Sequence, residues 1–142
     1  MLYASSQHIV DRLPNGQEGL ILLADRDGDG VADDAVVAGA LQDASDEIDT
    51  YVGVVYALPL PSAPAVLARL CVDIAVYRMG RDAARGTEED RKRYEDAIDL
   101  LKRIADKRAS LGPVAPGESA PAPASVASFS AQPRRFVRGK MP

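Results

Sequence analysis

The sequence predicts an all-α protein: a small bundle of four to five helices followed by an extended arm rich in Pro, Ala and Ser. Apolar residues recur at spacings of three and four in several segments, as on one face of a helix. Capping residues precede these segments, and Gly or Pro follows them. From Ser110 onward the periodicity stops, and Pro, Ala, Ser and Gly dominate. We therefore expect a helical domain over residues 1–109 and an arm over residues 110–142.

Two short segments open the chain. The first, SSQHIVDRLPNG, has serines able to cap a helix and a Pro-Asn-Gly stop. Its cap would be Ser5 or Ser6, and its apolar face comprises Ile9, Val10 and Leu13. The second segment, QEGLILLA, fits one or two helical turns or a short buried strand, because periodicity cannot decide at this length.

A longer helix is expected in DDAVVAGALQDASDEIDTYVGVVY. Asp33 or Asp34 stands at its N-cap, where a carboxylate is favoured. One stripe of the helix is apolar and comprises Leu41, Ala44, Ile48, Tyr51 and Val55. Much of the remaining surface is acidic and comprises Asp43, Asp46, Glu47 and Asp49.

The segment LPLPSAPA interrupts the helical pattern, because its prolines cannot continue a helix. The next segment, APAVLARLCVDIAVYRM, is the most apolar of the chain, and we expect it to form the central helix. Ser62 would cap this helix, Pro64 would lie in its first turn, and Gly80 would end it.

The last helix is expected to begin after Thr87. The sequence T-E-E-D places an acid three residues after a hydroxyl, as in a capping box, with Asp in place of the usual Glu. The body EEDRKRYEDAIDLLKRIADKR is acidic at its start and basic at its end, as the helix dipole favours. Its apolar stripe comprises Tyr94, Ile98, Leu101 and Ala105.

The net charge of -4 conceals an asymmetry. Residues 1–109 carry 13 Lys+Arg and 20 Asp+Glu, whereas residues 110–142 carry four basic residues and one acid. An acidic body with a basic tail predicts either a tail that docks on an acidic partner, such as another copy, or a solvated end. No apolar run approaches the ~20 residues that span a membrane. The N-terminus lacks the pattern of a signal peptide, so we expect a cytoplasmic protein unless an assembly carries it out.

Within the acidic stretch DRDGDGVADD at residues 25–34, the first nine residues, DRDGDGVAD, match the first nine positions of an EF-hand-type calcium loop. In that match Asp25, Asp27 and Asp29 supply oxygens at positions one, three and five, and Asp33 binds through water at position nine. Calcium is therefore the one cofactor that the sequence indicates, and otherwise we expect none.

The calcium match fails at position twelve, where Val36 replaces the bidentate Glu. The alternative is an acidic turn between two helices. In it, Asp25 and Asp29 make turn hydrogen bonds, and Asp33 or Asp34 caps the following helix.

No catalytic set emerges from the sequence, and we expect no enzyme. His8 is the only His, so a Ser-His-Asp or metal-His arrangement would depend on it alone. Cys71 is the only Cys and lies in an apolar run, which favours a buried structural thiol over a nucleophile. No Gly-rich phosphate loop of the Walker type is present.

The arm ends in RRFVRGKMP, where apolar residues interleave with basic ones. Apolar anchors flanked by positive charge are typical of a short docking peptide. The residues expected to bind a partner are Arg134, Arg135, Phe136 and Arg138. Contact with nucleic acid is the alternative, although the acidic body disfavours a DNA-binding face.

Five segments together resemble a known family. They are DRDGDG, the A-S-x-E-I-D-x-Y run from Ala44 to Tyr51, LPLP, the C-x-D-I-A-x-Y-R run from Cys71 to Arg78, and RYEDAI. In this order they resemble the small Mu-like prophage proteins that act as head–tail connectors. The resemblance covers roughly residues 1–112, and the basic, Phe-containing end is similar to the C-terminus of the family.

The resemblance implies a non-enzymatic, mostly helical structural protein of a tailed phage or prophage. Its location would be the head–tail interface of the virion, reached from the host cytoplasm during assembly. Proteins of this class form a ring, commonly of twelve copies, between the portal and a tail-side completion or terminator protein. Packaged DNA would pass through without sequence-specific binding, and the acidic helix from Asp34 to Tyr56 would supply an acidic lumen that does not retain it.

Two rivals come from other classes of protein. One is an EF-hand-like calcium-binding helical module, and the other is a DNA-binding regulator.

Overall fold

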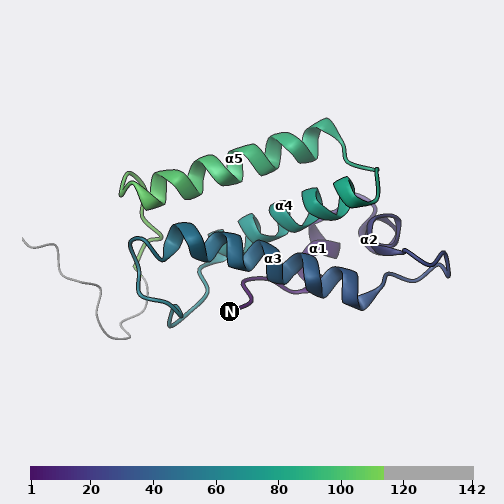
Figure 1. Cartoon of the computed structure of the whole chain (residues 1–142), viewed down its shortest axis with the longest axis horizontal. Helices are drawn as coiled ribbons and strands as arrows, with labels where there is room; N and C mark the ends of the chain where they lie inside the picture. The colour runs from purple at the N-terminus through teal and green to yellow at the C-terminus, as the bar shows by residue number, and fades with distance from the viewer. Residues whose placement is uncertain (114–142) are drawn as a thin grey trace, which may run out of the picture.

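The structure, a computed structural model, describes residues 1–113. Within that range the chain forms helices and no strand, so the predicted all-α class is confirmed. The helices are α1 (Ser6–Arg12), α2 (Gly16–Ala24), α3 (Asp34–Val52), α4 (Ala65–Asp82) and α5 (Glu88–Ala105), as Figure 1 shows. The predicted border at residue 109 stays a prediction, because nearly all of the arm lies outside the described residues.

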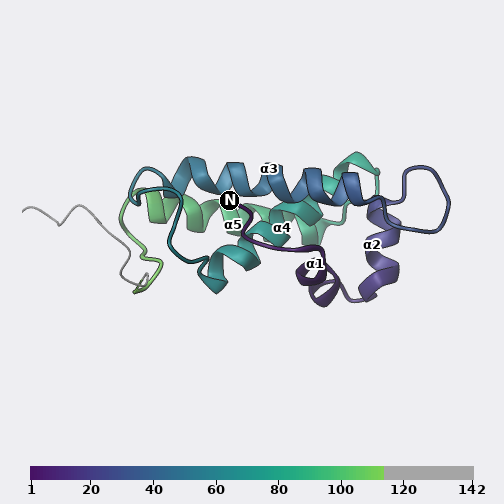
Figure 2. The same ribbon diagram turned by 90° about the horizontal axis from the view of Figure 1, so that it is seen from below.

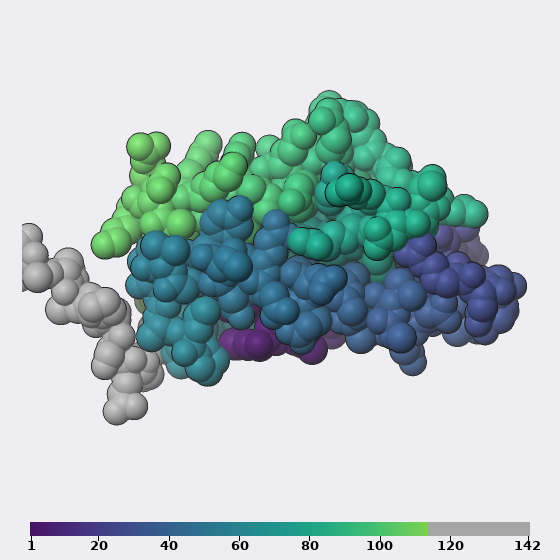
Figure 3. Space-filling model, viewed as in Figure 1, coloured from purple at the N-terminus to yellow at the C-terminus, as the bar shows by residue number. Residues whose placement is uncertain are grey.

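Helix α4 is the centre of the bundle, as its apolar sequence predicts. It packs against each of the other four helices. Helices α3 and α5 lie side by side on one face of the molecule (Figure 3), and α1 and α2 cover another part of α4 (Figure 2). None of the helices in residues 1–113 has the length and apolarity that crossing a membrane requires.

The helix starts follow the capping signals closely. Ser5 caps α1, and the second segment is helical rather than extended. At α5 the amide of Asp90 donates to Thr87 Oγ1 over 3.1 Å, and the amide of Thr87 donates back to Asp90 Oδ2 over 3.3 Å. This reciprocal pair is the predicted capping box, formed with Asp instead of Glu.

Three predicted helix limits were wrong. Pro64, not Ser62, is the N-cap of α4. Gly80 lies inside α4, which continues to Asp82. The absence of a side chain at Gly80 allows close packing, because a Cβ there would lie 3.2 Å from the Cα of Gly86. Helix α3 stops at Val52, so its predicted last apolar residues lie in the turn beyond it.

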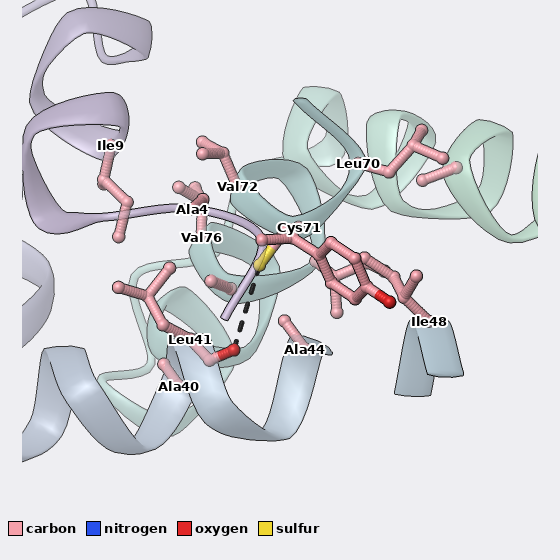
Figure 4. Close-up of a cluster of buried hydrophobic side chains, with 14 of the residues drawn as sticks. Ala4, Ile9, Ala40, Leu41, Ala44, Ile48, Leu70, Cys71, Val72 and Val76 are labelled. Atoms are coloured by element: carbon pink, nitrogen blue, oxygen red, sulfur yellow. Dashed lines mark hydrogen bonds between the residues drawn. The ribbon is translucent and has the colours of Figure 1, made fainter. Parts of the chain in front are cut away.

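The core is built from aliphatic side chains of all five helices and from Tyr3 and Ala4, which precede α1. Figure 4 shows one cluster of this core, where Cys71 of α4 faces Leu41 and Ala44 of α3. Among the described residues only two polar or charged side chains are buried, Ser45 and Asp73.

Candidate functional site

The Asp-rich loop joins α2 to α3 and projects from one end of the body (Figure 1). Carboxylate oxygens of Asp25, Asp27 and Asp29 lie within 4.8 Å of one another. Asp25 accepts hydrogen bonds from the amides of Gly28, at 2.7 Å, and Gly30, at 3.0 Å. Both glycines have positive φ, 78° and 82°, so the loop uses a conformation that other residues rarely adopt.

The pKa values of the loop carboxyls reflect this crowding. Desolvation raises the pKa of Asp25, but the Gly30 and Gly28 amides outweigh it and hold that pKa below its ordinary value. At Asp27 the amide of Asp29 lowers the pKa, but desolvation and the neighbouring acids outweigh that donor and raise it. Negative charge therefore accumulates at the centre of the loop, which is the electrostatic condition that a cation relieves.

Asp33 stands apart from the other three predicted ligands. It is the N-cap residue of α3, but its carboxylate makes no cap hydrogen bond and accepts instead from the amide of Arg26 at 2.9 Å. That bond closes the loop at its base. The structure thus gathers three of the four predicted metal ligands, and the half-buried Val36 in the first turn of α3 supplies no fourth carboxylate.

Donor chemistry in the loop suits a hard divalent cation. Calcium takes six to eight oxygen ligands, and three carboxylates fall short of that number unless water completes the shell. The same hydrogen bonds also form the acidic turn that the sequence offered as the alternative. The loop is therefore a defined turn, and Asp25, Asp27 and Asp29 are the residues that would hold a cation there.

The four acids predicted to line one acidic face are used in different ways. Asp43 and Asp46 are exposed on α3. Glu47 faces α4 and α5, where Arg78 Nη2 and the Tyr94 hydroxyl donate to it. Asp49 accepts from the Tyr3 hydroxyl. Two of the four acids thus hold the fold together, and the exposed acidic surface of α3 is smaller than the sequence suggests.

The Glu47 cluster joins the three long helices. Arg78 Nη2 lies 2.6 Å from one Glu47 oxygen, and the Tyr94 hydroxyl lies 3.2 Å from the other. The ring of Tyr94 stacks on that of Tyr77, with centroids 4.2 Å apart and 13° between their planes. The hydrogen bond that Arg78 donates to Glu47 raises the pKa of Arg78, and the Arg78 Nε atom is buried without an acceptor.

A second internal ion pair lies between α1 and α4. Arg12 Nε donates to Asp73 Oδ1 at 3.3 Å, and the Asp73 side chain is only 8% exposed. Desolvation raises the pKa of Asp73, and the nearby Arg12 opposes this only in part. Asp73 and Arg78 both stand in the apolar α4 sequence. Charged residues are seldom buried unless they are paired, so a charge in this apolar segment could have signalled both pairs.

The segment before α1 is fixed to α3. The amide of Tyr3 donates to Ser45 Oγ at 3.3 Å, and the Tyr3 side chain is buried. Ser45 Oγ also lies 3.5 Å from the sulfur of Cys71, which donates to the Leu41 carbonyl (Figure 4). Burial raises the pKa of the Cys71 thiol, which is the opposite of what activates a nucleophile. The predicted structural role of this Cys is consistent with that environment.

His8 is part of a helix cap. Its Nδ1 atom lies 3.0 Å from Ser5 Oγ and accepts from the Ser5 amide at the same distance. Both residues are exposed, and among residues 1–113 no carboxylate orients the other ring nitrogen. The contact therefore lacks the third member of a catalytic triad. The arm residues predicted to bind a partner, Arg134, Arg135, Phe136 and Arg138, lie outside the described residues.

A comparison with protein families decides where this chain belongs. Residues 3–129 match the family described as Bacteriophage Mu, Gp36. The chain belongs to this family. It is 30% identical over 118 residues to "Gene product J" of Escherichia phage Mu, an alignment that covers 83% of this chain and 82% of the relative. It is also 46% identical over 80 residues to "Mu-like prophage FluMu protein gp36" of Haemophilus influenzae.

The alignment with the Haemophilus protein covers 56% of this chain, and the chain spans about half the length of that relative, 55%. The Mu gp36 family membership confirms the coarse part of the sequence resemblance, which is a protein of Mu-like phages and prophages.

Proposed function

We propose that this member of the Mu gp36 family is a structural head–tail connector. In this proposal twelve copies form a ring between the portal and a tail-side completion or terminator protein, around the channel through which DNA leaves the head. The observation that carries the proposal is the family match over residues 3–129, because it places the chain among proteins of a tailed phage and its prophage relatives.

The described body supports a structural role. Its polar groups inside the bundle are used for fixing helices: Glu47 joins α3 to α4 and α5, and Asp73 joins α4 to α1. Such internal pairs keep helix positions well defined, which a subunit that must fit identical neighbours requires. The exposed Asp43 and Asp46 of α3 offer a surface that repels DNA.

The arm completes the proposal. A segment rich in Pro and Ala that ends in Arg134, Arg135, Phe136 and Arg138 suits contact with the portal or a neighbouring subunit. Removing residues 114–142 should leave the helical body folded, as circular dichroism would show, but should prevent incorporation into particles.

The experiment that tests the function is removal of the gene from an inducible prophage. We expect the lysate to contain DNA-filled heads and separate tails, and a copy supplied from a plasmid should restore joined, infectious particles. Electron microscopy and a plaque assay measure both outcomes. Joined and infectious particles in the absence of the protein would overturn the proposal.

A calcium-binding helical module is the second candidate, and the three converging carboxylates of Asp25, Asp27 and Asp29 favour it. Calorimetric titration with calcium separates the candidates. A connector with an incidental ion gives weak binding without a change in helicity, since the loop lacks the bidentate ligand that opens a sensor helix pair. Tight binding with a large rise in helicity would favour the module. Asp27→Asn is the control, and it should lower the calcium affinity whether that affinity is weak or tight.

A further inference from the structure

A shallow groove is lined by residues of α1 and of the first turns of α4. Its volume is about 510 Å³. Its lining includes small and apolar side chains, Ala63, Ala65, Ala68 and Val72. The first two are exposed, so this apolar surface is open to a partner.

The rim of the groove carries more positive than negative charge, in a body that is acidic overall. Arg12 and Arg69 both line it, with His8 and one exposed acid, Asp11. Asp11 accepts a hydrogen bond from Gln7 at 2.8 Å. Within residues 1–113 Arg69 makes no ion pair, and the Arg12 side chain stays 40% exposed although its Nε atom is bonded to a buried acid. Such a rim favours a partner that presents carboxylates around an apolar side chain.

The Asp-rich loop presents that combination. Val31 at its tip is 61% exposed, which is a large exposure for an aliphatic side chain. Asp27, Asp29 and Asp33 flank it in the sequence. The carboxylates of the loop are complementary in charge to Arg12 and Arg69 of the groove.

The loop cannot reach the groove of its own chain. Arg26 of the loop lies beside Arg78 and Arg81, near the C-terminal end of α4, whereas the groove lies at Ala65 and Ala68, near the N-terminal end. The 13 residues between Ala68 and Arg81 span about 20 Å of helix. Figure 1 shows the loop at the extremity of the body, away from the start of α4. An Asp-rich loop that occupies the groove must therefore come from another molecule.

We propose that the groove receives the Asp-rich loop of a second copy, with Val31 against the alanines and the loop carboxylates against Arg12 and Arg69. The contact joins two different surfaces, so it is head-to-tail, and such contacts close into rings or continue as filaments. This inference deepens the proposed ring by naming its subunit contact. The basic C-terminal peptide is a poorer occupant, because its arginines would meet Arg12 and Arg69.

Sedimentation of the full chain, with EDTA and over a wide range of protein concentration, tests the contact. We expect the wild type to associate, and Val31→Asp and Arg69→Glu each to weaken association at least tenfold. The matched control is Val54→Asp, because Val54 is as exposed as Val31, at 66%, but lies beyond the other end of α3. It should leave association unchanged. Circular dichroism checks that each variant is folded.

Cross-linking gives the second readout. A mixture of Val31→Cys and Ala68→Cys chains should form an intermolecular product with a short thiol cross-linker, whereas Val54→Cys with Ala68→Cys should not. The native Cys71 is buried and adds little background. The proposal is overturned if the wild type is monomeric at every concentration, if Val54→Asp weakens association as much as Val31→Asp, or if the first mixture gives no product.

The proposed subunit contact and the proposed connector role can fail independently of each other. A chain that is monomeric in solution but is needed to join heads to tails overturns the contact alone. Association that depends on Val31, in a protein whose removal leaves particles joined, overturns the connector role alone.

Discussion

Replacing Glu47 by Ala should destabilise the protein strongly, because this side chain holds three helices. The change removes a charged hydrogen bond from Arg78 at 2.6 Å and one from the Tyr94 hydroxyl at 3.2 Å. It also leaves the Arg78 guanidinium, whose Nε atom is already buried without an acceptor, with no counter-charge from Glu47.

The magnitude follows from those two bonds. A hydrogen bond to a charged group contributes about 1.5–3 kcal/mol, and breaking a fully buried ion pair costs about 3–5 kcal/mol. The Arg78 side chain is 39% exposed, so water compensates part of its charge. We therefore expect a loss of about 2–3 kcal/mol for Glu47→Ala, and about half of that for Glu47→Gln, which keeps one acceptor oxygen.

Urea unfolding followed by circular dichroism measures the effect. With an m-value of about 1.5 kcal/mol/M, the midpoint should fall by roughly 1.3–2 M. Asp46→Ala is the control, since Asp46 is an exposed acid on the same helix whose bond to Gln42 is on the surface, and it should cost less than about 0.5 kcal/mol. Equal effects of the two substitutions would refute the reasoning.

Three further predictions concern packing, titration and metal binding. Gly80→Ala should destabilise the protein by about 1–2 kcal/mol, because the added Cβ would lie 3.2 Å from the Cα of Gly86. Gly39→Ala should stabilise α3 by up to about 1 kcal/mol, because nothing lies within 4 Å of the added Cβ. Thermal melts should therefore shift in opposite directions, and shifts of the same sign would contradict the packing argument. The pKa of Asp73 is raised in the folded protein, so its contribution to stability is greatest below the unfolded pKa near 4 and is lost as the pH rises through the folded pKa. The urea midpoint should therefore fall less with rising pH in Asp73→Asn than in the wild type. An equal fall in both proteins would contradict a role of Asp73 in this pH dependence. Val36→Glu supplies the missing position-twelve ligand and should raise calcium affinity at least tenfold in calorimetry, and no gain would show that the loop is not built as a calcium site.

The sequence was sufficient for the fold class and for most helix starts. Capping signals are local, so Thr87 could be identified directly from its neighbours, and the cap of α1 could be narrowed to Ser5 or Ser6, of which the structure has Ser5. Gly80 was wrongly predicted to end α4, because the need for glycine there is not local. Gly80 permits the close approach of Gly86, and no pattern in the α4 sequence reveals that contact.

The candidate site was likewise predictable only where its contacts are local in the sequence. Asp25, Asp27 and Asp29 alternate within one loop, so their convergence follows from local geometry. The partners of Glu47 and Asp49 come from residues more than 30 positions away, Arg78, Tyr94 and Tyr3, and only packing brings them together. An acid on a helix surface and an acid in an internal cluster look alike in a single sequence.

The proposed ring between head and tail can be observed by electron cryomicroscopy of the neck of intact particles. We expect twelve five-helix bodies between the portal and the tail, with the α3 acids Asp43 and Asp46 toward the channel. A neck filled entirely by other proteins, with this chain absent from purified particles, would contradict it.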